Sequence, residues 1–273
     1  MGDIATNSRR VVNIVNNGQE ESQNIQKLLQ SMLVDNDFDV PEVFDQDAEL
    51  TICIGGDGSL LNLLAAYNFP SMPIVGVNTG HLGFFQELSV HDLRRFIELY
   101  KNEKYTEQIL KTVYADILTP EGTTSVIGLN EIVVKGGSSH LAHLRICIGE
   151  SFIEDFCGDG VVVSTPAGST AYNYSLGGSI VDPRLELLQV TPIAAINSTA
   201  YRSFTSSILL PPDLSLCIFP KYPKSDELLV TVDGFEKKFN GITEINAGFT
   251  DRNVTLLRFE DYSFWKTVKK KLL

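Results

Sequence analysis

Residues 51–61 place the strongest constraint on the fold of this chain. They read TICIGGDGSLL, so an apolar run ends in three glycines that enclose one aspartate, Asp57. A leucine-rich stretch follows at once, over residues 60–66. This order predicts a strand, a tight turn and a helix. Glycines let a ligand come close to the backbone, and the free N–H groups that begin a helix suit a phosphate.

Asp57 stands out within this turn because a carboxylate repels the phosphate that the glycines favour. Its presence therefore calls for a chemical reason. We expect it either to hold a metal ion or to polarise a hydroxyl group. A purely structural tight turn is the alternative for the glycines themselves.

Around this turn the chain alternates predicted strands with predicted helices, which favours a parallel α/β sheet. We predict a Rossmann-like N-terminal α/β domain over residues 1–106, with ligands bound beyond the carboxyl ends of its strands. The predicted strands are residues 11–15, 40–44, 50–54 and 73–77, and the predicted helices, beyond the one after the turn, are residues 22–33 and 90–100.

From about residue 107 the apolar segments become short and β-branched, with turn residues between them. This sequence pattern predicts a C-terminal, mostly β, sandwich-like domain over residues 107–261. Within it, one possible helix is expected at residues 185–190. The basic end of the chain, residues 262–273, is expected to form a helix that returns to the first domain. Its three lysines, residues 269–271, are interpreted as a solvated helix end.

Composition narrows the class of protein. The 273 residues carry a formal net charge of −12, which argues against a broad basic face for nucleic acid. No apolar run approaches the ~20 residues of a membrane span, and residues 1–10 lack the apolar core of a signal peptide. The four cysteines form no CxxC pair, so we expect free thiols in a cytoplasmic protein.

Three further segments have residues that suit a ligand. Residues 78–85 combine two glycines and two aromatic rings, which frame either a flat ligand ring or a hydrophobic loop; His81 there is expected to be a core histidine. Asn130 and Glu131 precede an apolar strand and can hydrogen-bond the hydroxyls of a ribose, although an Asx turn explains them as well. Residues 158–178 crowd glycines and hydroxyls, which favours a ligand-binding loop.

These pieces together resemble the NAD kinase family over most of the chain. Gly55-Gly56-Asp57-Gly58 is similar to the family's GGDG motif, and Asn130-Glu131 to its Asn-Glu or Asn-Asp pair. Residues 158–178 resemble its long glycine-rich motif, and residues 191–203 the segment after it. Phosphofructokinases and lipid kinases share GGDG alone, whereas the combination is far more selective. The chain has neither GxxxxGK[ST] nor GxGxxG.

The resemblance implies transfer of the γ-phosphate of ATP to the 2′-hydroxyl of the adenosine ribose of NAD, giving NADP. It implies Mg²⁺ or another divalent cation, and a homotetramer or homodimer with subunit-shared sites. It makes Asp57 the catalytic base, and Asn130 and Glu131 the ligands of the nicotinamide-side ribose. The other implied NAD-binding residues are Gly58, Leu61, Phe84, Asp159, Thr170, Ala171, Tyr172, Ser175, Ala194, Ile196 and Tyr201, with Ile196 and Tyr201 reaching a neighbouring subunit.

Several positions depart from the family's usual pattern. Cys157 stands where many members carry Arg or Lys, and Phe85 where many carry Tyr. Phe235 follows Gly234 in place of the commoner Gln, and Tyr174 replaces a Lys or small residue. These changes affect pocket detail and leave the core motifs intact.

A mechanism follows from general phosphoryl-transfer chemistry. The backbone of Gly55, Gly56, Gly58 and Ser59, with a divalent ion, is expected to hold the ATP phosphates, while Asp57 orients the 2′-hydroxyl and takes its proton late. Two rival functions are another GGDG-type kinase, acting on a lipid or sugar, and a non-catalytic dinucleotide sensor. Few basic residues stand near the motifs in the sequence, which argues against a sugar-phosphate site.

Overall fold

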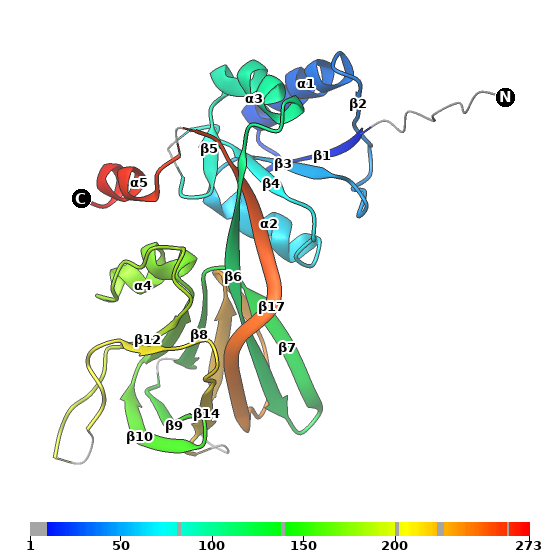
Figure 1. Ribbon diagram of the computed structural model, residues 1–273. Coiled ribbons are helices and arrows are strands. Elements are labelled where there is room, and N and C mark those ends of the chain that lie inside the picture. Colours follow the sequence, from blue (N-terminus) through cyan, green and yellow to red (C-terminus); the bar gives the residue numbers. More distant parts are fainter. Residues whose placement is uncertain (1–9, 81–82, 138–139, 200–201, 223–226, 261) are drawn as a thin grey trace. The chain divides into compact units, whose positions relative to one another are not determined.

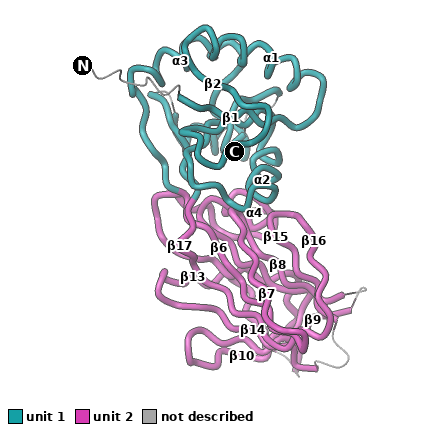
Figure 2. Tube along the Cα trace, turned by 90° about the vertical axis from the view of Figure 1, so that its right-hand side faces the viewer, with its two compact units in different colours: residues 1–109, 254–273 teal, residues 110–253 magenta. Residues whose placement is uncertain are grey.

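The computed structural model of the protein divides the chain into two compact units, coloured in Figure 2. Unit 1 comprises Met1–Ile109 and Val254–Leu273, and unit 2 comprises Leu110–Asn253. Two long strands, β6 (Thr106–Thr119) and β17 (Glu244–Arg258), run through both divisions, so no loop in the sequence marks either one. The residues that the structure describes are 10–80, 83–137, 140–199, 202–222, 227–260 and 262–273.

Unit 1 alternates strands with helices, and in Figure 1 α1 and α3 cover one face of its sheet while α2 lies on the other. The strands pair in parallel in the order β2-β1-β3-β4-β5, which confirms the predicted α/β class. Besides the ends of β6 and β17, its elements are β1 (Arg10–Asn16), α1 (Glu20–Val34), β2 (Phe38–Asp39), β3 (Leu50–Ile54), α2 (Asp57–Ala66), β4 (Ile74–Val77), β5 (Gln86–Leu88), the 3₁₀ helix η1 (Val90–Asp92), α3 (Leu93–Lys101) and α5 (Phe264–Lys271).

The core of unit 1 lies between this sheet and its helices. Every residue of β3 and β4 is buried, as expected for central parallel strands covered on both faces. Leu29 of α1 and Phe96 of α3 are fully enclosed against them. This packing fixes the carboxyl end of β3, where Asp57 follows as the first residue of α2. Among the described residues, no helix is both long and apolar enough to cross a membrane.

Unit 2 is built of two antiparallel sheets. One has the order β10-β9-β14-β17, with β6 and β7 continuing from β17, and the other has the order β13-β12-β11-β8-β15-β16. Its elements are β7 (Gly122–Gly128), β8 (Glu131–Gly136), β9 (Ala142–Ile148), β10 (Ser151–Gly158), β11 (Gly160–Ser164), η2 (Ala167–Thr170), α4 (Tyr172–Ser175), β12 (Leu188–Ile193), β13 (Ile208–Leu210), β14 (Leu216–Pro220), β15 (Leu228–Val232) and β16 (Phe235–Lys237), together with most of β6 and β17.

The two sheets of unit 2 share one apolar core. Ile132 and Val161 come from the second sheet, and Leu144 and Ile218 from the first, and all four are fully buried in the same cluster. Residues of alternate positions face this core, which is the pattern of a β-sandwich. The predicted sandwich-like domain is therefore confirmed.

Two predicted elements are wrong. The strand expected at residues 40–44 is instead the two-residue β2, Phe38–Asp39, because Pro41 has no N–H to donate to a ladder. The helix expected at residues 185–190 is absent: Leu185 closes a turn through its N–H to the Asp182 carbonyl at 3.0 Å, and β12 begins at Leu188. Pairing with β11 and β13 decides the conformation of this short apolar run.

Candidate active site

The glycine turn of unit 1, residues 55–58, is stabilised by hydrogen bonds to neighbouring residues of the same unit. Gly55 adopts a φ of +147° and donates its N–H to the Val77 carbonyl at 2.9 Å. A Cβ on Gly55 would overlap the hydroxyl of Ser59, which accepts the Gly56 N–H at 3.1 Å. Gly56 and Gly58 have open space around their Cα atoms, and Gly58 is exposed. Gly55 is therefore required by the turn, while Gly56 and Gly58 leave the backbone open to a ligand.

Asp57 is fixed by the chain segment that precedes β5. Its Oδ2 accepts the N–H of Phe84 at 3.0 Å, and its Oδ1 accepts the N–H of Phe85 at the same distance. Gly83 lies so close that a Cβ there would overlap Oδ1. The Asp57 side chain remains 28% exposed. The carboxylate is thus oriented by two backbone donors and still reaches solvent.

A cation from the carboxyl-terminal helix α5 lies beside the Asp57 carboxylate. The ammonium of Lys271, the last residue of α5, lies 3.5 Å from Asp57 Oδ2 and 4.9 Å from the centroid of the Phe84 ring. Lys271 is exposed at the end of a helix, as expected, and the fold also brings it to Asp57, which lies 214 positions away in the sequence.

A buried arginine supports residues 83–85, the segment that holds the Asp57 carboxylate and that we call the Asp57 cradle. Arg258, at the end of β17, is 4% exposed and donates to the carbonyl of Phe84 at 3.0 Å and to that of Phe85 at 3.3 Å. Burial lowers the pKa of Arg258 below its ordinary value. The negative charge of Glu87, whose carboxylate lies 3.6 Å away, offsets part of this shift. Gln86 adds a bond from its amide to the Gly56 carbonyl at 2.7 Å. Sequence reasoning missed these supporting residues, since only the fold brings them to the turn.

Leu61 and Phe84, the other residues predicted in unit 1, lie beside Asp57. Leu61 follows Asp57 by four positions on α2, hence on the same helix face, and is half-buried. Phe84 is also half-buried, and its ring lies 6.0 Å from that of Phe264. His81, in the same segment, lies outside the described residues.

In unit 2, the Asn130–Glu131 pair is clamped by Asp233. The Asp233 carboxylate accepts the backbone N–H of Leu129 at 2.7 Å, of Asn130 at 2.7 Å and of Glu131 at 3.2 Å. Asp233 itself has a φ of 49° in the tight turn between β15 and β16, with Gly234 at 85°. The Asp-Gly pair is the usual signal for such a turn, and it is the signal that could have identified Asp233.

The side chains of this pair are buried and incompletely hydrogen-bonded. Asn130 is 7% and Glu131 is 6% exposed, and Asn130 Oδ1 and Glu131 Oε2 have no hydrogen-bond partner. Burial, followed by the negative charge of Asp233, raises the pKa of Glu131 to about 8, against a lowering by the N–H of Tyr172. Burial also raises the pKa of Asp233, although its three N–H donors lower it. Within the part of the chain that the structure describes, these two polar atoms have no hydrogen-bond partner, and both can bond a ligand.

The small polar residues that follow β11 serve two purposes. Four of them, Ser164, Thr165, Ser169 and Asn173, are at most 1% exposed and bond within the protein: Thr165 to the Leu129 carbonyl at 2.6 Å, and Asn173 to Thr191 at 2.6 Å. These residues build the loop. The whole run is expected to bind a ligand, whereas these four residues hydrogen-bond within the protein.

The remaining loop residues lie near the Asn130–Glu131 pair. The Asn130 carbonyl accepts the Thr165 N–H at 2.9 Å, and a Cβ on Gly168 would overlap that same carbonyl. Thr170, Ala171 and Tyr172 are half-buried, and Ser175 is exposed at the end of α4. The Tyr172 hydroxyl accepts from the Lys135 ammonium at 3.3 Å. The structure therefore brings these predicted residues to the Glu131 end of β11.

Asp159, Ala194 and Ile196 belong to a second group. Asp159 donates its N–H to the Ile193 carbonyl at 2.9 Å, and Ile196 donates to the Cys157 carbonyl at 2.8 Å. β11 has Ser164 opposite Glu131 at one end and Gly160 opposite Ile193 at the other. The two groups are thus separated by the length of β11, roughly 13 Å at ~3.3 Å per residue. The Tyr172 side chain extends toward the second group, since it packs against the cluster of Val133, Val162 and Ile193 and its hydroxyl accepts from Lys135, which pairs with Gly160.

Of the four residues that depart from the family's usual pattern, two are buried and two are exposed. Cys157 is buried, and its N–H donates to the Ser203 hydroxyl at 2.9 Å. Phe85 is also buried, whereas Tyr174 and Phe235 are exposed. Tyr201, a predicted NAD-binding residue, lies outside the described residues.

Comparison with known proteins identifies the family. Residues 6–105 match the ATP-NAD kinase N-terminal domain, and residues 129–254 match the ATP-NAD kinase C-terminal domain. The NAD kinase of Finegoldia magna is 34% identical over 271 residues, which cover 98% of this chain and 99% of that protein. The NAD kinase of Latilactobacillus sakei is 33% identical, covering 94% of this chain and 96% of that protein.

Solved structures show the same fold. Yeast NADH kinase complexed with NADH superposes with a TM-score of 0.84 at 19% identity, over 98% of this chain and 88% of that one. An NAD kinase from Archaeoglobus fulgidus in complex with ATP gives a TM-score of 0.75 at 21% identity, over 96% of this chain and 98% of that one. The chain belongs to the NAD kinase family.

Proposed function

We propose that this protein transfers the γ-phosphate of ATP to the 2′-hydroxyl of the adenosine ribose of NAD, giving NADP and ADP. The observation that carries the proposal is the geometry of Asp57: a carboxylate fixed by two N–H donors, open to solvent, at an exposed glycine turn. The family membership of both units supports the same activity.

Asp57 acts as the base in this proposal. A carboxylate offers about four lone-pair positions, and Phe84, Phe85 and Lys271 use three of them. The fourth accepts the hydrogen bond of the 2′-hydroxyl and orients its oxygen toward the γ-phosphorus. An ordinary aspartate is too weak a base to deprotonate a sugar hydroxyl beforehand, so the proton moves to Asp57 as the P–O bond forms.

Unit 2 binds the dinucleotide. Asn130 Oδ1 and Glu131 Oε2, both buried without a partner, hydrogen-bond the hydroxyls of the nicotinamide-side ribose. Because the pKa of Glu131 is about 8, its carboxyl group is largely protonated at pH 7 and donates one of these bonds. Thr170, Ala171, Tyr172 and Ser175 contact the rest of the molecule. In unit 1, Gly58, Leu61 and Phe84 contribute to NAD binding.

The phosphate chain of the donor binds at the backbone of Gly56, Gly58 and Ser59, of which Gly58 is exposed, with Gly55 shaping the turn. Among the described residues, no three His, Cys, Asp or Glu side chains gather into a metal cage. Mg²⁺ commonly binds through one or two carboxylates together with substrate phosphates. The divalent ion therefore enters as part of the MgATP substrate.

A homodimer or homotetramer is the assembly that we propose. Asp159 and Ala194 bind the dinucleotide in this proposal, and Ile196 and Tyr201 reach the dinucleotide bound by a second copy. The edge strand β10 supports association because its Phe152 and Ile153 side chains are 58% and 41% exposed. The four free cysteines suit a reducing, cytoplasmic location.

One assay tests the proposed function. Purified protein is incubated with MgATP and NAD, and NADP is measured with an NADP-specific dehydrogenase; we expect turnover. Binding of NAD without turnover would establish a dinucleotide sensor instead. Phosphorylation of a lipid or sugar without NADP would establish a different GGDG-type kinase.

A further inference from the structure

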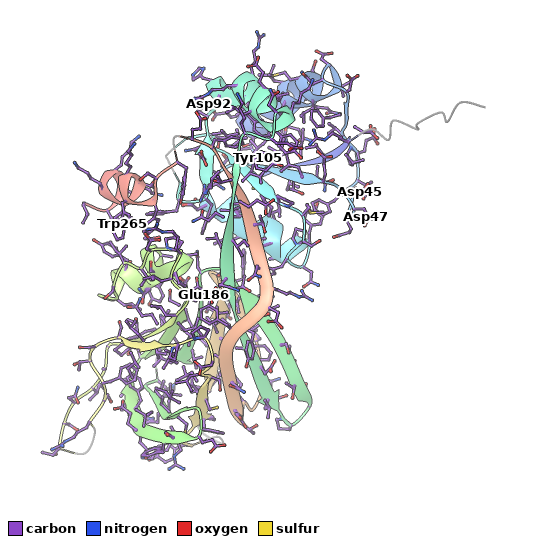
Figure 3. All side chains as sticks on the ribbon, viewed as in Figure 1. Asp45, Asp47, Asp92, Tyr105, Glu186 and Trp265 are labelled. Carbon is purple, nitrogen blue, oxygen red and sulfur yellow. The ribbon has the colours of Figure 1, made fainter. Side chains whose placement is uncertain are left out.

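α5 brings a row of lysines to the Asp57 site of unit 1. The helix is anchored by Phe264 and Val268, which are buried, while Trp265, labelled in Figure 3, is half exposed. Thr267 also donates its hydroxyl to the Ser263 carbonyl at 3.2 Å. The position of the helix on unit 1 is therefore set by its apolar face and by its first turn. This anchoring determines where the lysines of α5 lie.

The ion pair of Lys271 with Asp57 is not explained by stability. Both side chains are close to 30% exposed, and pairs of such exposure stabilise a protein by at most about 1 kcal/mol. The pair instead places a positive charge at the proposed site of phosphoryl transfer.

A cavity of about 220 Å³ lies beside this pair, between α5 and the segment before and within β5. Lys266 and Lys270 line it from α5, and Gly83 and Gln86 line it from the other side. Glu87 also lines the cavity, but the guanidinium of Arg258 offsets its charge at 3.6 Å. In a chain of net charge −12, this concentration of cations suits an anion.

We propose that α5 forms the cationic side of the triphosphate site. Lys271 faces the transferring γ-phosphoryl group, and Lys266 and Lys270 bind the remainder of the phosphate chain in the cavity. The inference rests on the proposed function and assigns the donor phosphates to residues outside the glycine turn. Phosphoryl transfer depends on cations placed at the oxygens that gain charge.

The reaction balances without a further co-reactant. The 2′-oxygen bonds to the γ-phosphorus as the bond from that phosphorus to the β,γ-bridging oxygen breaks, releasing ADP. The hydroxyl proton passes to Asp57. Lys271 keeps its three protons throughout: one N–H remains directed at Asp57 Oδ2, and the other two donate to γ-phosphoryl oxygens. The same ammonium thus aligns the base and neutralises the group that moves.

Four lysine variants test the inference. We expect Lys271→Met to lower kcat by roughly 10²-fold with the KM for NAD unchanged, and Lys271→Arg to recover most of that loss because a cation is restored. We expect Lys266→Met and Lys270→Met to raise the KM for ATP several-fold with kcat nearly unchanged. Inorganic triphosphate should inhibit the wild-type protein competitively with ATP, and more weakly in the last two variants.

Lys269→Met is the matched control, because Lys269 is exposed on the same helix and does not line the cavity. Its kinetics and melting temperature should equal those of the wild type. If wild-type protein makes NADP and Lys271→Met keeps kcat within threefold, the inference fails and the proposed function stands. If wild-type protein makes no NADP, both fail. A loss in Lys271→Met that Lys271→Arg does not recover would contradict the role of the charge.

Discussion

The two units place their principal carboxylates in opposite electrostatic surroundings. Asp57 of unit 1 is 28% exposed, accepts two backbone N–H groups and contacts the Lys271 ammonium. Glu131 of unit 2 is 6% exposed, has one oxygen without a partner and experiences the charge of a second carboxylate, Asp233. The second environment raises the pKa of Glu131, chiefly through burial.

This difference supports the two roles that we propose for residues of one chemical type. We propose Asp57 as the base because two N–H donors hold its carboxylate, which still reaches solvent. We propose that Glu131 recognises a ribose because a carboxyl group with a pKa of about 8 can donate as well as accept a hydrogen bond. Four predictions test this separation of roles.

The largest expected effect is that of Asp57→Asn. We expect kcat to fall by roughly 10²-fold or more, with NAD affinity retained, because the base is lost. An amide can accept only one of the two N–H bonds from Phe84 and Phe85, so a modest drop in melting temperature should accompany it. Steady-state kinetics and calorimetry provide the measurements. Asp47→Asn, at an exposed aspartate labelled in Figure 3, is the control; near-normal turnover in Asp57→Asn would refute the role.

Removing the clamp of unit 2 should come next. Asp233→Ala leaves three backbone N–H groups of residues 129–131 without an acceptor, and we expect a loss of about 2 kcal/mol of stability. NAD should also bind more weakly, since the Asn130–Glu131 pair loses its support. Asp233→Asn retains one acceptor oxygen and should lose less. Denaturant unfolding compares the variants, and equal stability of Asp233→Ala and wild type would contradict the clamp.

A smaller effect is expected from crowding Asp57 without changing its charge. A Cβ in Gly83→Ala overlaps Asp57 Oδ1 and must displace the carboxylate, so we expect kcat to fall roughly 10-fold. Gly80→Ala is the control, because a Cβ added there would meet no other residue's heavy atoms within 4 Å. Steady-state kinetics of both variants measure this change in kcat. Equal activities would show that the position of the carboxylate is not critical.

The smallest effect concerns the pH dependence of stability. The folded-state pKa of Glu131, about 8, exceeds its ordinary value of 4.5. Between these values the folded protein binds more protons than the unfolded chain, so this group lowers stability as pH rises, with the full cost present above pH 8. Glu131→Gln removes the titration. We expect the variant to gain more than about 1 kcal/mol relative to wild type between pH 5 and pH 8.

Denaturant unfolding across this pH range measures that difference. Glu154→Gln, at a partly exposed glutamate of the same unit, is the control and should follow the wild type. A constant difference between Glu131→Gln and wild type from pH 5 to pH 8 would show that Glu131 is charged throughout.

Local patterns predicted most elements because they depend on neighbouring residues. The strand at β3, the glycine turn and the α2 helix follow from residues 51–66, where apolar runs and glycines stand in order. The Asn130–Glu131 pair and the loop after β11 were also found from composition. The predictions failed where pairing with another strand overrode a short apolar run, as at β12.

The sequence by itself determined the class of each unit, the turn around Asp57 and the family, because motifs and periodicity are properties of adjacent residues. Only the tertiary structure decided which groups act on those motifs. Lys271 and Arg258 reach the Asp57 cradle, and Asp233 reaches the Glu131 backbone, across more than a hundred residues of chain each. Burial and charge at a site depend on such distant partners, so the surroundings of Asp57 and Glu131 differ for reasons that no local pattern contains.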